Sequence, residues 1–228
     1  MPALIALLVA LLSALLIVVA LWLALRRARR ADVIRSQPLP PGLFDKLRAR
    51  HPQLTQRDCQ LVAQALRQFF LAYLKGGLRP VAMPSQVVDD LWHEFILHTR
   101  AYEAFCAAAF GRFLHHTPAA SLSSVSDSNA GLRRCWWQCC RAENIHPARP
   151  TRLPLLFAID RKLAITGGYV YALDCMAPRA AAADGSGGVI VHCAGDFGSS
   201  GIDGSTDGFG DGDGGGDGDG GGDGGGGD

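Results

Sequence analysis

The chain has 228 residues, of which 22 are Lys or Arg and 21 are Asp or Glu, so its formal net charge is +1. This balance gives no support for a polyanionic partner, but it hides an uneven distribution. Nine aspartates and no basic residue follow Gly195. The rest of the chain therefore carries 22 basic and 12 acidic side chains, an excess of ten positive charges.

The segment 2–25 contains no charged residue, and Ser13 bears its only hydroxyl group. A helix needs about 20 apolar residues to cross the hydrocarbon core of a bilayer, so the sequence predicts a transmembrane anchor over residues 1–25. A cleaved signal peptide would have a basic stretch before a shorter apolar run. Here only two residues precede the run and a basic stretch follows it, so we expect an uncleaved anchor.

Four arginines lie between residues 26 and 30, directly after the apolar run. Basic residues close to the end of a membrane span are retained on the cytoplasmic side. We therefore expect a single-pass membrane protein with its N-terminus outside, and with the domain and the tail in the cytoplasm. The lipid bilayer is the first partner that the sequence predicts.

Beyond the anchor, the sequence predicts a basic and Pro-rich juxtamembrane linker (26–42), a helical domain (43–194) and a Gly/Asp-rich tail (195–228). The expected fold is mainly α. Apolar spacing and capping residues predict helices over 43–50, 55–75, 86–110, 132–141 and 154–164, with a polar loop over 117–130. Thr55 with Asp58 three residues later is typical of a helix N-terminus.

Two strand-like runs, 169–175 and 188–193, can pair as a loose β-hairpin that leans on the helices. The tail that follows is nearly all Gly and Asp, so it cannot bury enough apolar surface to offset the entropy of ordering, and we expect it to be disordered. A calcium-binding repeat would need a large apolar residue in every repeat, and the stretch after Phe209 has none.

Seven cysteines occur at irregular spacing, which does not resemble a disulfide framework in a reducing compartment. A zinc site with four thiolates usually shows two C-x₂₋₄-C pairs, and the second pair is absent. We expect the cysteines to pack as small buried side chains. They are Cys59, Cys106, Cys135, Cys139, Cys140, Cys175 and Cys193.

Four of the seven histidines gather in one region, His93, His98, His115 and His116. His93-Glu94 followed by His98 superficially looks like a zinc-protease motif, which needs histidines four residues apart. A separation of five places His93 and His98 roughly 140° apart around a helix, so they cannot bind one ion from an unbroken helix.

Other pairings in this region remain open. Asp89 and His93 are four residues apart, and His115 or His116 can fold back beside His93 after Gly111 ends the helix. One or two histidines with a carboxylate would suit zinc or iron. The alternative, which we prefer at this point, is that these side chains form capping and surface pairs, so no cofactor is predicted. Asp89, His93, His115 and His116 are the candidate metal ligands.

The stretch VVDDLWHEFILHTRAYEAFC (87–106), with FGRFLHHTP (110–118), resembles the glycine-rich domain-containing protein-like family of plants and bacteria. The resemblance is specific over 43–118 and weak as far as 173. It implies a helical domain with no assigned enzymatic activity, in which a Gly-rich C-terminal tail recurs. Plant members show W-H-x-H, which Trp92 and His93 match. Phe95 stands where the second histidine would be, which counts against a metal site.

The leading functional hypothesis is a cytoplasmic-facing, membrane-anchored adaptor or scaffold with an unknown protein partner, because no complete catalytic constellation accompanies the anchor. The alternative is a metal-dependent enzyme at the membrane surface that uses the His93/His98/His115/His116 region. Nucleic-acid binding is not expected, because the excess positive charge lies mainly near the bilayer and no recognition motif is present. No catalytic residue is predicted.

Overall fold

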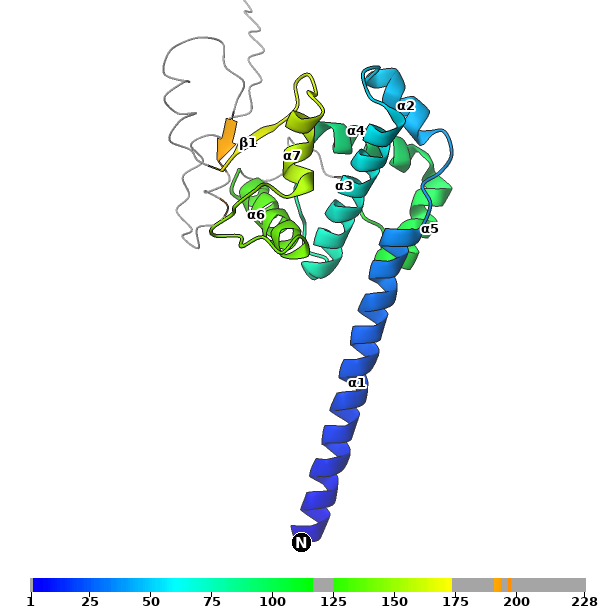
Figure 1. Ribbon diagram of the computed structural model, residues 1–228. Coiled ribbons are helices and arrows are strands. Elements are labelled where there is room, and N and C mark those ends of the chain that lie inside the picture. The colour runs from blue at the N-terminus through cyan, green and yellow to red at the C-terminus, as the bar shows by residue number, and fades with distance from the viewer. Residues whose placement is uncertain (1, 117–124, 174–190, 194–196, 198–228) are drawn as a thin grey trace, which may run out of the picture.

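The computed structural model describes residues 2–116, 125–173, 191–193 and 197, and its architecture is mainly α-helical, as predicted. A bundle of short helices sits at one end of a long helix that projects from it (Figure 1). The elements are α1 (Pro2–Ser36), α2 (Leu43–Arg50), α3 (Gln56–Lys75), α4 (Gln86–Leu97), α5 (Thr99–Phe110), α6 (Val125–Ala142), α7 (Leu155–Lys162), β1 (Val170–Ala172) and β2 (Val191–Cys193).

Within the described residues, α1 is the one helix that is long and apolar enough to cross a membrane, by its length and composition. Its most apolar 18-residue window has a mean hydropathy of 3.2, and none of that window is buried inside the protein. Soluble domains rarely leave so large an apolar surface uncovered, so this part of α1 needs another covering.

The helix does not end with the apolar run. It continues to Ser36, through the first part of the segment where a linker was expected. Arginine and alanine favour helix, and no proline occurs between Pro2 and Pro38. Ala31 and Ile34 are buried against the domain. The long helix therefore enters the domain as one continuous rod.

Arg67 of α3 fixes the end of this rod. Its guanidinium donates to the carbonyl oxygens of Ile34 (3.2 Å) and Gln37 (2.9 Å), two groups that the helix end would otherwise leave without a partner. Burial lowers the pKa of Arg67. Because an arginine stays charged even so, the contact is a permanent charge-assisted clamp between α3 and α1.

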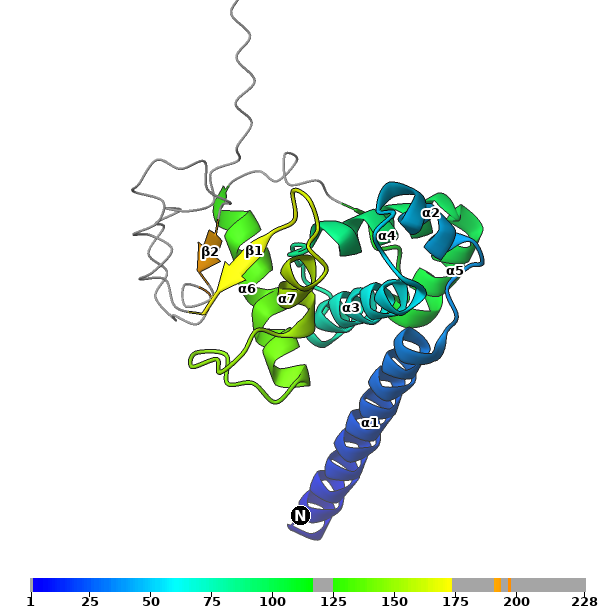
Figure 2. The same cartoon turned by 45° about the horizontal axis from the view of Figure 1, so that its top comes forward.

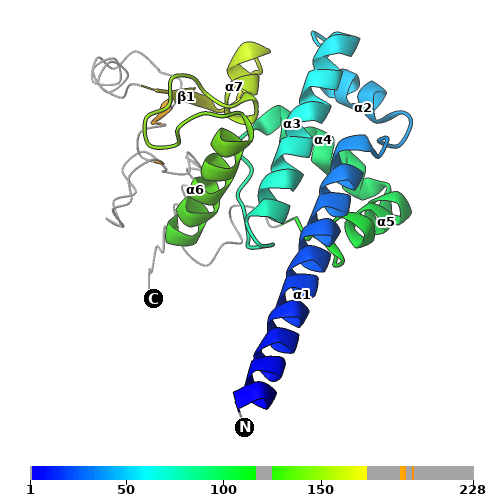
Figure 3. The same ribbon diagram turned by 60° about the horizontal axis from the view of Figure 1, so that its bottom comes forward.

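α3 is the central helix of the domain, packed against α1, α2, α4, α6 and α7, and Figure 3 shows it between α1 and α6. The predicted N-terminus is confirmed: Thr55 Oγ1 accepts the Asp58 backbone N–H (3.2 Å), and the Asp58 carboxylate accepts the Thr55 N–H (2.9 Å). The buried face presents Phe69 and Phe70 to the rings of α4 and α5.

The single helix expected over 86–110 is wrong at its centre, where His98 (φ −79°, ψ 61°) separates α4 from α5. The break has a tertiary cause. α4 packs on α2 and α3, whereas α5 packs on α1, and one straight helix could not cover both surfaces. Phe95 and Tyr102 still meet across the break, with ring centroids 5.2 Å apart.

The second half of the domain differs from the prediction in two places. α6 starts at Val125, inside the stretch expected to be a loop, whereas α7 lies within the predicted 154–164. The two strands pair, with Val170 opposite Val191, but they are parallel (Figure 2), so the expected hairpin is wrong. Parallel strands require a longer crossover between them than a hairpin turn supplies.

The core extends past the expected domain boundary at residue 194. Phe197 is 2 % exposed and packs against Trp136, Phe157 and Tyr171. The Trp137 indole N–H also donates to the Phe197 carbonyl oxygen (3.2 Å). Apart from Phe197, the tail expected over 195–228 lies outside the described residues.

Phe197 gives the first prediction. Phe197→Ala, or deletion of residues 194–228, should destabilise the chain by about 3 kcal/mol, because a buried aromatic side chain is lost. Deletion of 199–228 keeps Phe197 and should leave the free energy of unfolding nearly unchanged. Both are measured by denaturant unfolding in mild detergent. Equal stability of the two truncated chains would contradict the packing of Phe197.

A second prediction concerns Glu143, which joins the end of α6 to the start of α7. Burial alone would raise the pKa of Glu143, but hydrogen bonds from the Leu155 N–H (2.6 Å), Arg152 and Gln68 outweigh it and hold the pKa below its ordinary value. Ionised Glu143 therefore stabilises the folded chain above that value, and this stabilisation is lost as the pH falls through the folded pKa.

Glu143→Gln should accordingly destabilise the chain by about 1–2 kcal/mol at neutral pH. The difference from the unaltered chain should shrink as the pH falls below about 4.5, the ordinary value for glutamate. Denaturant unfolding across a pH series measures it. A difference that stays constant down to acid pH would show that the charge of Glu143 is not involved.

Candidate metal centre

The buried carboxylate of Asp160 holds the first turn of α4, the helix that carries two of the candidate ligands. Asp160 of α7 is 2 % exposed, and its carboxylate accepts the Ser85 hydroxyl (2.6 Å) and the backbone N–H groups of Gln86 (2.7 Å), Val87 (3.2 Å) and Tyr169 (2.9 Å). A buried charge needs such complete hydrogen bonding. The carboxylate satisfies N–H groups that a helix start leaves unpaired, so α7 fixes the position of α4.

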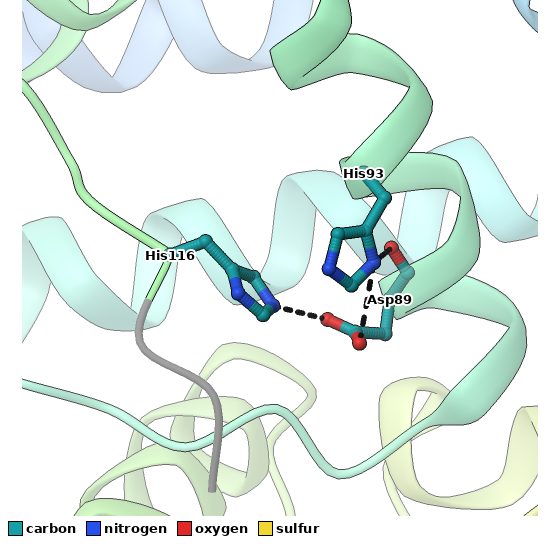
Figure 4. Close-up of side chains that lie close together, drawn as sticks. All are labelled: Asp89, His93 and His116. Carbon is teal, nitrogen blue, oxygen red and sulfur yellow. Dashed lines mark hydrogen bonds and ion pairs between the residues drawn. The ribbon is translucent and has the colours of Figure 1, made fainter. Parts of the chain in front are cut away.

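One turn into α4, the Asp89 carboxylate contacts two imidazoles that lie side by side, those of His93 and His116 (Figure 4). Its Oδ1 is 3.0 Å from Nε2 of His116, and its Oδ2 is 3.4 Å from Nδ1 of His93. The two imidazole centroids are 4.2 Å apart. Of the two histidines that the sequence allows beside His93, it is His116 that folds back, and one potential ligand atom from each of the three residues lies within 4.8 Å of the others.

One hydrogen bond also indicates the tautomer of His93. His93 Nδ1 is 3.0 Å from the backbone oxygen of Asp89, which can only accept, so the proton belongs on Nδ1. That assignment leaves Nε2 of His93 with an available lone pair, and a metal-binding histidine commonly has its second nitrogen held in this way. His93 is 45 % exposed, so the site opens to solvent.

His116 comes from a different segment, and a buried network holds it in place. The Trp92 indole N–H donates to the Tyr102 hydroxyl (3.1 Å), which donates to the Leu114 carbonyl oxygen (2.6 Å). This network pins the strand-like return of the chain after Gly111 against α4. The Trp92 ring then packs on the His116 imidazole, with centroids 4.7 Å apart.

The other histidines of the region are elsewhere. His115 is exposed and its ring contacts Phe113, with centroids 4.8 Å apart. His98 is exposed at the break between α4 and α5. Of the four candidate ligands, the structure therefore brings together Asp89, His93 and His116, and it leaves His115 outside the cluster.

The sequence counted Phe95 against a metal site, because it replaces the second histidine of W-H-x-H, but the structure removes this argument. Phe95 is 2 % exposed and packs against Tyr102 and Phe105. Its side chain points into the core, away from the carboxylate of Asp89. The second imidazole of this cluster comes from His116, about 20 residues further along the chain, which a short motif around Trp92 does not include.

A second polar cluster lies on another face of α4. Buried Asp90 accepts from Arg50 (2.5 Å) and His51 (2.7 Å), and Arg50 also approaches Glu94 (3.7 Å). All of these groups are paired with one another, and they tie the end of α2 to α4. Adjacent aspartates thus have different tasks: Asp90 joins two helices, whereas Asp89 faces the histidines.

The cysteines behave as packed side chains. Cys59, Cys106, Cys135, Cys139 and Cys140 are all buried as free thiols. Burial raises the pKa of Cys59 and Cys106, and that of Cys140 to about 12, so these thiols stay protonated at neutral pH. Cys135 and Cys139 lie 4.0 Å apart, sulfur to sulfur. The side chains of the remaining two cysteines lie outside the described residues.

Sequence reasoning identified the three clustered residues but missed the groups that position them. Asp160 carries no local signal, because its partner Ser85 is 75 residues away. Tyr102 lies within the predicted helix 86–110, but its two hydrogen bonds join residues on different segments, which the sequence does not indicate. The one hint in the sequence is that Trp92 and Tyr102 bear polar groups that must find partners once buried.

No curated protein and no solved structure matches the chain. A family model described as UCP032817-like matches residues 29–197. The match covers more than half of the chain, starting within the basic segment of α1 and ending at Phe197, and thus contains the whole helical bundle and the histidine cluster. The description of this family does not include the glycine-rich name of the family that the motif resembles. The chain belongs to the UCP032817-like family.

Proposed function

We propose that this is a single-pass membrane protein whose cytoplasmic domain holds one divalent metal ion on Asp89, His93 and His116. The observation that carries the proposal is the convergence of two imidazoles and one carboxylate within 4.8 Å. Nitrogen and oxygen ligands bind zinc at about 2.0–2.2 Å, so ligands of one tetrahedral ion lie roughly 3.3 Å apart. The 3.0 Å separation between Oδ1 of Asp89 and Nε2 of His116 is close to that value.

The donor set indicates the kind of metal. Three protein ligands that include two histidines and one carboxylate are typical of zinc sites that keep a position for water, and of non-haem iron sites with open positions. The exposure of His93 leaves room for an additional ligand from solvent. In such a site the ion would polarise a bound water or a substrate oxygen, which supports metal-dependent chemistry at the membrane surface.

This proposal replaces the adaptor that the sequence alone favoured. Asp89 is only 21 % exposed and His116 only 17 % exposed, so these polar side chains are largely withdrawn from water. Surface pairs at the end of a helix would not require Trp92 and Tyr102 to hold the returning chain in place. A scaffold with an unknown protein partner remains the function to consider if the metal is absent. The resemblance to glycine-rich domain-containing proteins rests on the motif around Trp92, and it assigns no activity that would favour the scaffold.

Anchoring and orientation belong to the same proposal. The uncovered apolar length of α1 is long enough to span a bilayer, and four arginines follow it. Those arginines favour a cytoplasmic domain, because basic flanks are retained on that side. The docking of Ala31 and Ile34 on the domain supports an anchor that remains attached.

The metal prediction is as follows. The purified full-length chain should bind one Zn²⁺ or Fe²⁺, and His93→Ala or Asp89→Ala should weaken binding by about 100-fold or more, since loss of a supporting hydrogen bond alone costs about 10–100-fold. Affinity should fall in acid, because the ligands must be deprotonated. Calorimetric titration and elemental analysis measure both effects.

His115→Ala and His98→Ala are the matched controls, because each removes an exposed imidazole from the same region, and they should bind metal like the unaltered chain. His93→Ala should also nearly keep its melting temperature, because the His93 side chain is 45 % exposed and contributes little to the core. An unaltered chain that binds no metal would reject the centre. So would a His93→Ala variant that retains full affinity.

A test of the membrane orientation by thiol labelling needs an accessible cysteine, because burial protects the five described native thiols. Lys162→Cys places a thiol at the exposed end of α7. A membrane-impermeant maleimide should modify this variant only after the cells are permeabilised, with the unaltered chain as the background control. Modification in intact cells would place the domain outside, contrary to the proposal.

A further inference from the structure

The point where α1 leaves the domain lies close to the expected membrane surface. Arg30 is five residues beyond Leu25, the last residue of the apolar run, which corresponds to about 7.5 Å along a helix. The polar headgroup layer on one side of a bilayer is of similar thickness, about 5–7 Å. Because α1 continues into the domain without a hinge, the surface around its exit must lie at the headgroups once α1 spans a bilayer.

The C-terminal ends of α3 and α5 meet α1 at this exit. Gly111 ends α5 with φ +73°, and a Cβ at this position would overlap the guanidinium of Arg30, which lies directly over the glycine. Arg112 then donates to the Tyr73 hydroxyl (2.7 Å) and to the Leu78 carbonyl oxygen (2.8 Å). Figures 1 and 3 show the C-terminal end of α3 beside α1.

Exposed basic side chains surround the exit. We name as the basic collar Arg26, Arg27, Arg29, Lys75 and Arg79, all of which are exposed. Among the described residues none of the five forms an ion pair with an acidic side chain. The segments 72–80 and 110–116 contain no acidic residue, and Asp32 on α1 already pairs with Arg35 (3.0 Å).

We propose that the basic collar binds anionic lipid headgroups and so presses the domain onto the bilayer, an inference that rests on the proposed anchoring but not on the metal centre. Basic residues that served only to set the orientation of the membrane span would all lie on α1. Here Lys75 and Arg79 of the folded domain extend the same charge sideways over the membrane. Anionic lipids of the cytoplasmic leaflet attract basic side chains that lie within a Debye length of the surface.

The test uses the full-length chain in lipid nanodiscs of phosphatidylcholine, with or without phosphatidylserine. Hydrogen exchange of the backbone amides at 75–79 should be slower by about fivefold in the phosphatidylserine discs, which corresponds to about 1 kcal/mol, the contribution of one basic residue near an anionic surface. Lys75→Glu with Arg79→Glu should abolish the difference, and so should high salt.

Arg161→Glu with Lys162→Glu is the matched control. It makes the same change in charge at the end of α7, which Figure 1 places on the side of the domain away from the N-terminus of α1. This variant should keep the phosphatidylserine effect. The collar is rejected if the unaltered chain exchanges equally in both lipids, or if both double variants behave alike. A chain that fails to incorporate into either disc would instead reject the anchoring.

Discussion

A single buried carboxylate determines where the site can be. Asp160 is 2 % exposed, so its carboxylate must find partners in the hydroxyl and N–H groups around it, and those groups lie at the start of α4 and at Tyr169. Replacing it would leave several buried donors unpaired at once. This contact with α7 fixes the first turn of α4, and the packing of α4 on α2 and α3 fixes the rest of the helix that carries Asp89 and His93.

The polar residues of α4 contact different partners because they lie on different faces of the helix. Neighbouring positions point about 100° apart on a helix, so Asp89 and Asp90 face different neighbours. Asp90 pairs with Arg50 and His51, whereas no arginine or lysine pairs with Asp89 among the described residues. The Asp89 carboxylate beside the histidines is therefore open to an added cation as a partner.

Features with local causes could be predicted from the sequence, and features with distant causes could not. The cap at Thr55 and the extent of α7 depend on neighbouring residues, and both are confirmed. The meeting of His93 with His116 was predictable because Gly111 ends a helix and lets the chain return. The break at His98 was not, because it follows from the separate surfaces that α4 and α5 cover. Nor was the burial of Phe197, since a lone aromatic among glycines resembles a solvated tail.

The unbroken entry of α1 into the domain has a consequence for encounter kinetics. On the proposed topology, the domain cannot swing or extend on a tether, so the histidine cluster keeps a nearly constant height above the lipid. This arrangement does not raise the rate at which a ligand dissolved in the cytoplasm meets the site. A ligand that is itself confined to the bilayer meets the site by diffusion in two dimensions, at a local concentration far above its average in the cell.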